Sequence, residues 1–339
     1  MTLRAAIEIA TDGQEVPQPV LEAAFGEIMD GEAEPVQIAA LLVALRTKGE
    51  SVGEIVATAR ALRARATTCS VVDPRTVDTC GTGGSGLDTF NISTTAAFVV
   101  AGAGVPVAKH GNRAASGRSG SFDVFEALGV DIDLPIETCG RILAEVGIGA
   151  FYARVAHPAF RFIAPVRQQL GIRTLMNCLG PLLNPAGARH QLVGVYAREL
   201  VEPLASSLGA LGARRALVVH GNDGMDEITT TGSSFGALFD EGALRSFEIE
   251  PARLGIPLAR LEELSGGDPA QNAEITRAIL AGESGPRRDI VLLNAAGALW
   301  AAGAAADLAE GLELARRSID GGAAAASLEA LVRASREAA

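Results

Sequence analysis

The sequence predicts an α/β protein, with a small all-helical N-terminal domain followed by a large α/β domain built on a mainly parallel central sheet. Two observations predict this architecture. Apolar residues recur at helical spacing through the first 70 residues, and from Arg75 onward short apolar strands alternate with glycine-rich loops and helices. Such alternation is typical of parallel sheets covered by helices. We expect the helical domain to span residues 1–70, with a contribution from about 160–185, and the α/β domain to span 71–339.

The helical part shows two apolar stripes and a helix start. Val20, Leu21, Ala24, Phe25, Ile28 and Met29 form one stripe, and Ile38, Leu41, Leu42 and Leu45 form another. Ser51 and Glu54 make a capping box ahead of a helix predicted over 55–65.

The remaining elements follow in order along the α/β part. Strands are predicted over 76–79, 105–108 and 216–219. Helices are predicted over 93–103, 123–128, 136–146, 200–211 and 272–281, and the alanine-rich stretch 295–339 is also predicted to be helical.

Composition excludes several classes of protein. The 339 residues carry a formal net charge of −11, which argues against a partner that is nucleic acid. No apolar run reaches the roughly 18–20 residues that a bilayer span needs, and residues 1–10 do not resemble a signal peptide. The four cysteines show no CxxC pairing, so disulfide frameworks and zinc knuckles are not expected. We therefore expect a cytoplasmic protein without membrane or nucleic-acid partners.

The first loop that carries chemistry is C-G-T-G-G-S-G at residues 80–86, after the first predicted strand. It matches the dinucleotide pattern G-x-G-x-x-G, but a polar loop follows instead of a helix, and residues 99–110 lack the acid that would bind a ribose. A Walker loop is excluded because neither Lys48 nor Lys109 is followed by Ser or Thr. We interpret the loop as a cradle of backbone N–H groups for phosphate, with Ser93 capping the next helix. The alternative is a glycine-rich turn without a ligand.

Two further loops also follow predicted strands. Residues 109–121, K-H-G-N-R-A-A-S-G-R-S-G-S, combine cations, serines and glycines in an acidic protein and favour a polyanionic ligand. In residues 221–232, Asp226 and Glu227 are adjacent carboxylates that suit Mg²⁺, which prefers one or two carboxylates together with waters and substrate phosphates. Solvated loops with incidental charge are the alternative for both.

A fourth segment, residues 157–185, contains V-R-Q-Q-L-G-I-R-T and L-G-P-L-L-N-P. Arg167 and Arg173 are candidates for a carboxylate clamp, because a guanidinium can pair with a carboxylate through two parallel hydrogen bonds. Each arginine alone is more typical of a surface or helix-cap position than of a ligand-binding one. The turn at 180–185 is interpreted as a rigid pocket wall.

Together these segments resemble the anthranilate phosphoribosyltransferases. The strings G-T-G-G, N-I-S-T, K-H-G-N-R, V-R-x-x-L-G-I-R-T, L-G-P-L-x-N-P and D-E occur in that family's order over essentially the whole chain. The resemblance implies a nucleoside phosphorylase-like fold, a homodimer formed through the helical domain, and the transfer of a phosphoribosyl group from 5-phosphoribosyl-1-pyrophosphate to anthranilate in tryptophan biosynthesis. It implies no dedicated catalytic side chain, because electrostatics and positioning supply the acceleration.

The resemblance also implies roles for individual residues. The phosphoribosyl donor would be bound by Gly81, Thr82, Gly83, Gly84, Thr89, Asn91, Ser93, Thr94, Lys109 and Ser121. Anthranilate would be bound by Gly81, His110, Asn112, His157, Arg167, Gly180 and Pro181. Ser93 with Glu227 would hold one Mg²⁺ and Asp226 with Glu227 a second, giving two ions per subunit.

The chain departs from the family pattern at one position. Where the family usually has G-T-G-G-D-G, this chain has Ser85 in place of the aspartate, and we hypothesise that Asp88 partly substitutes for it. Two alternative functions stay open at this point. One is a pyrimidine nucleoside phosphorylase-like enzyme, and the other is a non-catalytic nucleic-acid-binding relative of the fold, which the acidic balance disfavours.

Overall fold

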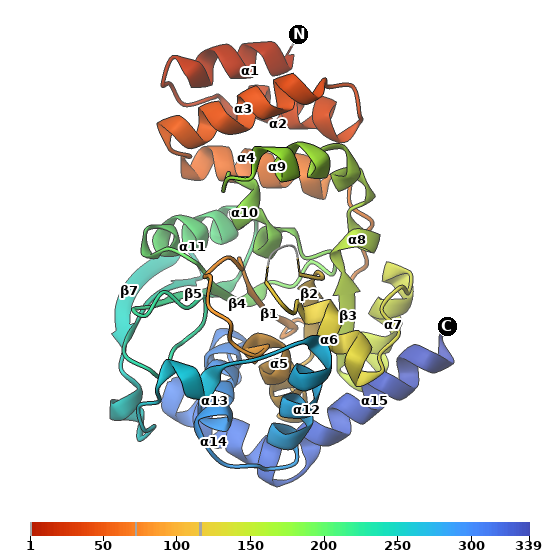
Figure 1. Cartoon of the computed structure of the whole chain (residues 1–339), viewed down its shortest axis with the longest axis vertical. Helices are drawn as coiled ribbons and strands as arrows, with labels where there is room; N and C mark the ends of the chain where they lie inside the picture. The colour runs from red at the N-terminus through yellow and green to blue at the C-terminus, as the bar shows by residue number, and fades with distance from the viewer. Residues whose placement is uncertain (1, 72, 115–116) are drawn as a thin grey trace.

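The computed structural model describes residues 2–71, 73–114 and 117–339. A helical bundle lies at one end of the molecule, and a sheet with its covering helices forms the rest (Figure 1). The bundle contains α1 (Thr2–Thr11), α2 (Gln18–Met29), α3 (Pro35–Lys48) and α4 (Val52–Arg63). The predicted capping box starts α4: the Ser51 hydroxyl accepts from the Glu54 N–H at 3.1 Å, and the Glu54 carboxylate accepts from the Ser51 N–H at 2.9 Å.

The sheet has seven strands in the order β3-β2-β1-β4-β5-β6-β7 within the described residues. The strands are β1 (Val77–Gly81), β2 (Val107–Gly111), β3 (Ile148–Tyr152), β4 (His190–Gly194), β5 (Arg215–Gly221), β6 (Ser234–Asp240) and β7 (Ala243–Ile249). The first five pair in parallel, and β6 and β7 are antiparallel, so the predicted mainly parallel sheet is confirmed.

The predicted strands end too early. The sequence prediction stopped β1 at Thr79 and β2 at Ala108, because residues 80–86 and 109–121 were interpreted as loops. In the structure β1 runs on through Gly81, which pairs with Gly194 of β4, and β2 runs on through Gly111, which pairs with Tyr152 of β3. Lys109 and His110 therefore lie in a strand and not in a loop.

Larger helices cover the sheet: α5 (Ile92–Gly102), α6 (Ser121–Leu128), α7 (Ile136–Val146), α11 (Val201–Ala210), α12 (Pro269–Leu280), α13 (Pro286–Ala301), α14 (Leu308–Asp320) and α15 (Ala323–Glu337). The alanine-rich stretch 295–339 is helical as predicted, forming the end of α13 together with α14 and α15. Among the described residues, none of the helices is both long enough and apolar enough to cross a bilayer.

Side chains alternate between two cores, one on each face of the sheet. Leu217 and Val219 of β5 belong to the core formed with α5 and α13 to α15, whereas Ala216 and Val218 belong to the core that contains α11 and the helical bundle. Apolar residues between 163 and 183 join this second core, from α9 (Ala164–Leu170), α10 (Met176–Leu179) and the 3-10 turn Gly180–Leu183. The domain boundary near residue 70 stays a prediction.

Arg63 links the bundle to the sheet domain at the end of α4. Its guanidinium donates to the Leu182 carbonyl at 2.6 Å and to the Leu211 carbonyl at 3.1 Å. Since α4 also packs along α11, the bundle is held above the carboxyl ends of the parallel strands (Figure 1).

Candidate active site

A cleft of about 1390 Å³ opens where the parallel strands end, between the sheet and the 153–183 segment. This is the edge at which α/β sheets bind ligands. Every residue predicted to bind a substrate or metal lines it: Gly81, Thr82, Gly83, Gly84, Thr89, Asn91, Ser93, Thr94, Lys109, His110, Asn112, Ser121, His157, Arg167, Gly180, Pro181, Asp226 and Glu227. Residues separated by up to 146 positions in the chain thus share one cleft.

The glycine-rich loop after β1 has the backbone that its sequence predicts. Gly83, Gly84 and Gly86 have φ values of +67°, +81° and +77°, a region that favours glycine. The Gly83 N–H donates to the Asp226 carboxylate at 2.9 Å. One amide of the predicted phosphate cradle is therefore already paired with a side chain of the acidic loop.

Asp226 can approach β1 and β4 only because glycines end both strands. A Cβ at Gly81 would lie 2.7 Å from the Asp226 Oδ2, and a Cβ at Gly194 would lie 1.6 Å from the Asp226 carbonyl oxygen. Asp223 holds the start of the same loop, because its carboxylate accepts from the hydroxyls of Thr229 and Thr231, both at 2.6 Å.

Glu227 accepts a hydrogen bond from the Ser93 N–H at 3.2 Å. Burial, followed by the neighbouring Asp226 carboxylate, raises the pKa of Glu227 to about 8. The prediction that Ser93 caps α5 is wrong. The helix begins at Ile92, one residue earlier than expected, so Asn91 occupies the capping position and Ser93 lies in the first turn.

Lys109 is a buried cation close enough to Glu227 to act on its carboxyl group. Its side chain is 2% exposed, and its ammonium donates to the Thr79 carbonyl. Its charge acts on both Glu227 and Asp78, opposing the rise that burial causes in the pKa of each carboxyl. Buried charges need such opposite partners.

The cleft also has a neutral side, near Gly180 and Pro181. Burial, with smaller contributions from His157 and Lys109, lowers the pKa of His110 to about 3, and burial lowers the pKa of His157 to about 4. The two imidazole rings meet edge to face with their centroids 5.3 Å apart. His157 Nε2 lies 3.0 Å from the Leu183 carbonyl, so the neutral ring carries its proton on that nitrogen.

The two candidate arginines of the 157–185 segment differ in their surroundings. Arg167 lines the cleft from α9, and burial lowers the pKa of its guanidinium. Arg173 is already engaged: its guanidinium stacks 4.3 Å from the centroid of the Tyr196 ring and donates to the Gly84 carbonyl. Of the two, Arg167 is the one whose guanidinium is available to a carboxylate.

Comparisons with known proteins identify the family of this fold and cleft. Residues 4–66 match the model of the glycosyl transferase family helical bundle domain, and residues 73–325 match that of its a/b domain. The chain is 54% identical to the anthranilate phosphoribosyltransferase of Moorella thermoacetica over 97% of both chains, and 51% identical to that of Rhodospirillum rubrum over 97% of this chain and 95% of the relative.

Solved structures agree with the sequence relatives. The anthranilate phosphoribosyltransferase of Thermus thermophilus superposes with a TM-score of 0.93 at 44% identity, covering 98% of this chain and 99% of the other. The Saccharomyces cerevisiae enzyme in complex with PRPP and Mg gives 0.90 at 26% identity, covering 99% and 98%. The chain belongs to the anthranilate phosphoribosyltransferase family. The resemblance that its motifs indicated is confirmed, as is the predicted fold.

The position at which this family member departs from the usual motif also faces the cleft. Ser85 and Asp88 both line it, and the Asp88 carboxyl group is exposed, whereas its backbone carbonyl accepts from the Gly266 N–H at 2.8 Å. Asp88 is thus near enough to the cleft to serve as the substitute for the missing aspartate, which stays a hypothesis.

The sequence prediction missed a buried residue, Asp78, that supports the wall of the cleft. Asp78 is fully buried in β1, and its carboxylate accepts from the His110 N–H at 3.2 Å and from the Asn184 side-chain amide at 2.8 Å. It therefore connects the strand that carries Lys109 with the L-G-P-L-L-N-P turn. A buried acid within an apolar strand was a signal that could have found it.

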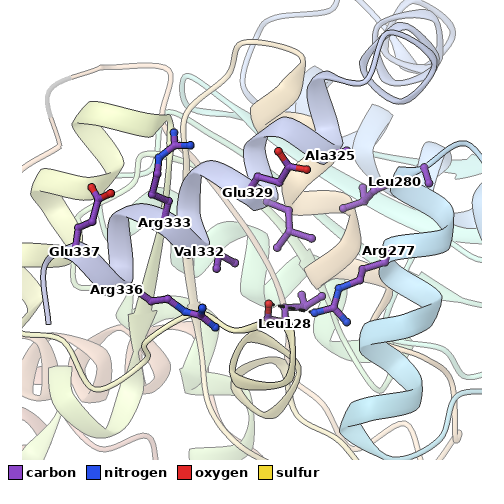
Figure 2. A pocket seen from close by; sticks show the side chains of 11 residues that line it. Leu128, Arg277, Leu280, Ala325, Glu329, Val332, Arg333, Arg336 and Glu337 are labelled. Atoms are coloured by element: carbon purple, nitrogen blue, oxygen red, sulfur yellow. Dashed lines mark hydrogen bonds between the residues drawn. The ribbon is translucent and has the colours of Figure 1, made fainter.

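A smaller cavity of about 740 Å³ lies away from the family's site, between α12, α15 and the end of α6 (Figure 2). Arg277 donates to the Leu128 carbonyl at 3.2 Å, and Arg336 donates to the Gly129 carbonyl at 2.9 Å. These guanidinium groups satisfy carbonyls that the end of a helix leaves without partners. Two of the arginines that line the cavity, Arg277 and Arg336, therefore already have a structural role.

Proposed function

We propose that the chain transfers the 5-phosphoribosyl group from 5-phosphoribosyl-1-pyrophosphate to the amine of anthranilate, giving N-(5-phosphoribosyl)anthranilate and pyrophosphate. The observation that carries this proposal is the single cleft in which a glycine-rich loop, an acidic pair and Arg167 meet. Family membership supports it, because the relatives carry this enzyme's name and the yeast structures contain PRPP with Mg or 4-fluoroanthranilate.

The donor would occupy the side of the cleft next to β1 and α5. Gly84 and Thr82 belong to the loop whose amides and hydroxyl would face its pyrophosphate, with Asn91 toward the ribose. Gly81, Gly83, Thr89, Ser93, Thr94, Lys109 and Ser121 complete the proposed donor set. Lys109 and the first turn of α5 supply positive potential there.

The acidic pair fits Mg²⁺. Within the described residues no cluster of three or more His, Cys, Asp or Glu side chains could hold a metal by itself. Asp226, Glu227 and the Ser93 hydroxyl offer the incomplete oxygen set that suits an ion sharing its coordination with substrate phosphates. We assign Ser93 and Glu227 to one ion and Asp226 and Glu227 to a second. When bound, Mg²⁺ neutralises negative charge on the pyrophosphate.

Anthranilate would occupy the neutral side. Arg167 would pair with its carboxylate, and the uncharged rings of His110 and His157 would contact its aromatic ring. Gly81, Asn112, Gly180 and Pro181 complete the proposed acceptor set. An acid with one carboxylate and one apolar ring matches the guanidinium of Arg167 beside the neutral rings of His110 and His157.

The chain's own residues contribute orientation and electrostatics. Lys109 and the loop amides stabilise the negative charge that develops on the leaving pyrophosphate as the bond to the ribose C1 breaks. Arg167 holds anthranilate with its amine toward that carbon. The aromatic amine attacks in its neutral form and needs no prior deprotonation, so no side chain is assigned as a general base.

The reaction is tested by the fluorescence of anthranilate. When purified protein is mixed with anthranilate, the donor and Mg²⁺, the anthranilate fluorescence should fall. In a metal-free sample treated with chelator, the fluorescence should stay constant. A parallel sample with uridine or thymidine and phosphate tests the nucleoside phosphorylase alternative. Turnover of the nucleoside, without consumption of anthranilate, would contradict the proposal.

We infer a homodimer and a cytoplasmic location, supported by the surface and by the cysteines. Val36 and Val43 of α3 are exposed apolar side chains one heptad apart on the bundle, and they support a homodimer formed through it. Light scattering should give twice the mass of 34.8 kDa, and Val36→Glu should weaken the dimer.

Four free cysteines support a reducing, cytoplasmic location, and the net charge of −11 supports the absence of a nucleic-acid partner.

A further inference from the structure

Asn272 lies behind the donor side of the cleft, in the first turns of α12. It is 1% exposed, and both its side-chain oxygen and its side-chain nitrogen are hydrogen-bonded. Its Oδ1 accepts from the Gly267 N–H at 2.8 Å, and its Nδ2 donates to the Asn91 Oδ1 at 2.8 Å. It therefore contacts a residue of the proposed donor set from a part of the chain 181 residues away.

The Gly267 N–H fixes the direction of these hydrogen bonds. A backbone N–H can only donate, so it must face the oxygen of the Asn272 amide, and the Asn272 nitrogen must then face Asn91. Asn91 consequently presents its oxygen to Asn272 and its nitrogen to the Ser119 carbonyl, at 3.3 Å. The orientation of one amide determines that of the next.

The segment that carries Gly267 is itself fixed against the loop before Asn91. The Gly266 N–H donates to the Asp88 carbonyl at 2.8 Å, and a Cβ at Gly266 would lie 2.6 Å from the backbone of Phe90. Only glycine allows this approach. The Gly267 N–H, at which this chain of hydrogen bonds begins, is therefore held in a fixed position relative to the side of the cleft assigned to the phosphoribosyl donor.

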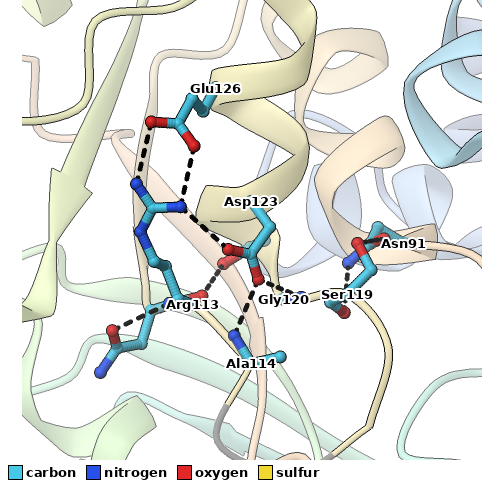
Figure 3. A network of polar contacts seen from close by, with 9 residues as sticks. Asn91, Arg113, Ala114, Ser119, Gly120, Asp123 and Glu126 are labelled. Carbon is cyan, nitrogen blue, oxygen red and sulfur yellow. Dashed lines mark hydrogen bonds and ion pairs between the residues drawn. The ribbon is translucent and has the colours of Figure 1, made fainter. Parts of the chain in front are cut away.

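At its other end this chain of hydrogen bonds, which runs from Gly267 through Asn272 and Asn91, reaches the segment before α6 (Figure 3). The Ser119 hydroxyl donates to the Asn91 Oδ1 at 3.1 Å. The next residue, Gly120, donates its N–H to the Asp123 carboxylate at 2.8 Å, and Arg113 pairs with Asp123 and with both oxygens of Glu126. Asn91 thus joins the segment before α6, through Ser119, to α12, through Asn272.

Asn91 holds the capping position of α5, but its side chain makes no hydrogen bond to that helix. Its amide has two N–H groups, and within the described residues its one hydrogen-bond acceptor is the Ser119 carbonyl. Because Asn91 lines the cleft, the second N–H is available to a ligand. A reversed amide would present an acceptor oxygen instead, which an anionic donor would not favour.

We propose that Asn272 is a positioning residue for the phosphoribosyl donor, acting through Asn91. It fixes the Asn91 amide so that Asn91 offers an N–H to the donor. The inference rests on the proposed function for the identity of the donor, and it assigns to α12 a part in substrate selection that the donor-binding motifs do not include.

Asn272→Asp keeps the shape of the side chain but replaces the N–H that faces Asn91 by an oxygen. We expect the KM for the donor to rise about tenfold and the KM for anthranilate to stay within about twofold. Asn272→Ala introduces no charge and should also raise the donor KM. A rise in both variants would show that the lost orientation of the Asn91 amide, and not repulsion between a new carboxylate and the anionic donor, is the cause.

Thr276→Val is the matched control. Thr276 lies one turn further along α12, is fully buried, and pairs its hydroxyl with that of Thr95 at 2.8 Å. The variant removes a buried α12–α5 hydrogen bond of similar length, so its melting temperature should fall while both KM values stay unchanged. Combining Asn91→Ala with Asn272→Ala should raise the donor KM no further than Asn91→Ala alone.

The inference is overturned if both Asn272 variants keep the wild-type donor KM, if the two KM values rise together, or if the double variant shows additive effects. A soluble Asn272 variant that melts lower than the wild type without a shift in the donor KM also counts against it. The wild type is the separate check of the proposed function: if it does not consume anthranilate with the donor, that proposal fails whatever the variants do.

Discussion

The two sides of the cleft present different chemical groups, one set suited to the phosphoribosyl donor and the other to anthranilate. On the donor side, the carboxyl groups of Asp226 and Glu227, the buried ammonium of Lys109 and the backbone amides of the glycine-rich loop gather where β1, β2 and β5 end. On the acceptor side, His110 and His157 are neutral rings, and Arg167 contributes the cation assigned to the ligand. The donor side is built mainly from the loops that follow the parallel strands and from the first turn of α5, and the acceptor side mainly from the 153–183 segment.

The contrast explains why one cleft can distinguish two anions. A polyphosphate with bound metal gains most from many charges and amides, whereas an aromatic monocarboxylate gains from one guanidinium and uncharged surfaces. If the two sides are independent, a change on one should alter binding of its own substrate alone. The following predictions test that independence, from the largest expected effect to the smallest.

The largest effect is expected from Glu227→Gln. It removes a carboxylate from the proposed metal set, and we expect kcat/KM for the donor to fall about 100- to 1000-fold. Steady-state rates at several Mg²⁺ concentrations would measure it. Glu241→Gln, which removes an exposed carboxylate paired with Arg214 on the far hairpin, is the control and should leave the rates unchanged. Equal rates for the wild type and Glu227→Gln would remove Glu227 from the site.

Arg167→Ala should act on the other side. Loss of a charge-assisted pair costs about 1.5–3 kcal/mol, so the KM for anthranilate should rise roughly tenfold to a hundredfold while the donor KM stays unchanged. Arg161→Ala is the control at the cleft rim, where Arg161 stacks 4.6 Å from the centroid of the Phe162 ring. A parallel rise in both KM values would show that Arg167 is not an anthranilate clamp.

Ser85, where this chain departs from the family motif, offers a further test of metal binding on the donor side. Ser85→Asp restores the carboxylate that the family motif usually has, and we expect the Mg²⁺ concentration for half-maximal activity to fall about tenfold. Asp88→Asn tests the proposed substitute and should shift the same midpoint upward. If Asp88→Asn leaves both the Mg²⁺ response and the donor KM unaltered, Asp88 has no such role.

The neutral histidines predict an acid-dependent stability. An unfolded histidine has a pKa near 6.5, above the folded values of about 3 for His110 and about 4 for His157. The unfolded chain therefore binds protons first, so stability is full above about pH 6.5 and is lost as the pH falls toward 4. Each histidine contributes a loss of about 1.4 kcal/mol per pH unit.

Urea unfolding at pH 7, 6 and 5 would measure this slope. His157→Gln cannot take up a proton, so its free energy of unfolding should fall less steeply between pH 6 and 5, by about 1.4 kcal/mol per unit. Parallel curves for the wild type and the variant would show that His157 is not held neutral by the fold.

Local patterns in the sequence predicted the fold and the residues that line the cleft. The positive φ values of Gly83 and Gly84, the Ser51–Glu54 capping box and the parallel sheet all follow from short-range signals. The motif strings collected residues that the sheet edge brings together, because loops after parallel strands meet at one edge.

Long-range contacts could not be predicted in this way. Asp78 and Asn272 contact the site through partners 32, 106 and 181 residues away, and nothing in their own segments specifies those partners. The prediction for Ser93 failed for a related reason. The Asn91 side chain bonds to α12 and Ser119 instead of to its own helix, so the start of α5 lacks the usual local signal.

The independence of the two sides is tested most directly by direct binding of both substrates to two variants. Calorimetric titration of Arg167→Ala and Glu227→Gln with anthranilate, and with the donor plus Mg²⁺, gives four dissociation constants. The account predicts that Arg167→Ala weakens anthranilate alone and that Glu227→Gln weakens the metal-bound donor alone. Equal weakening of the same substrate by both variants would contradict it.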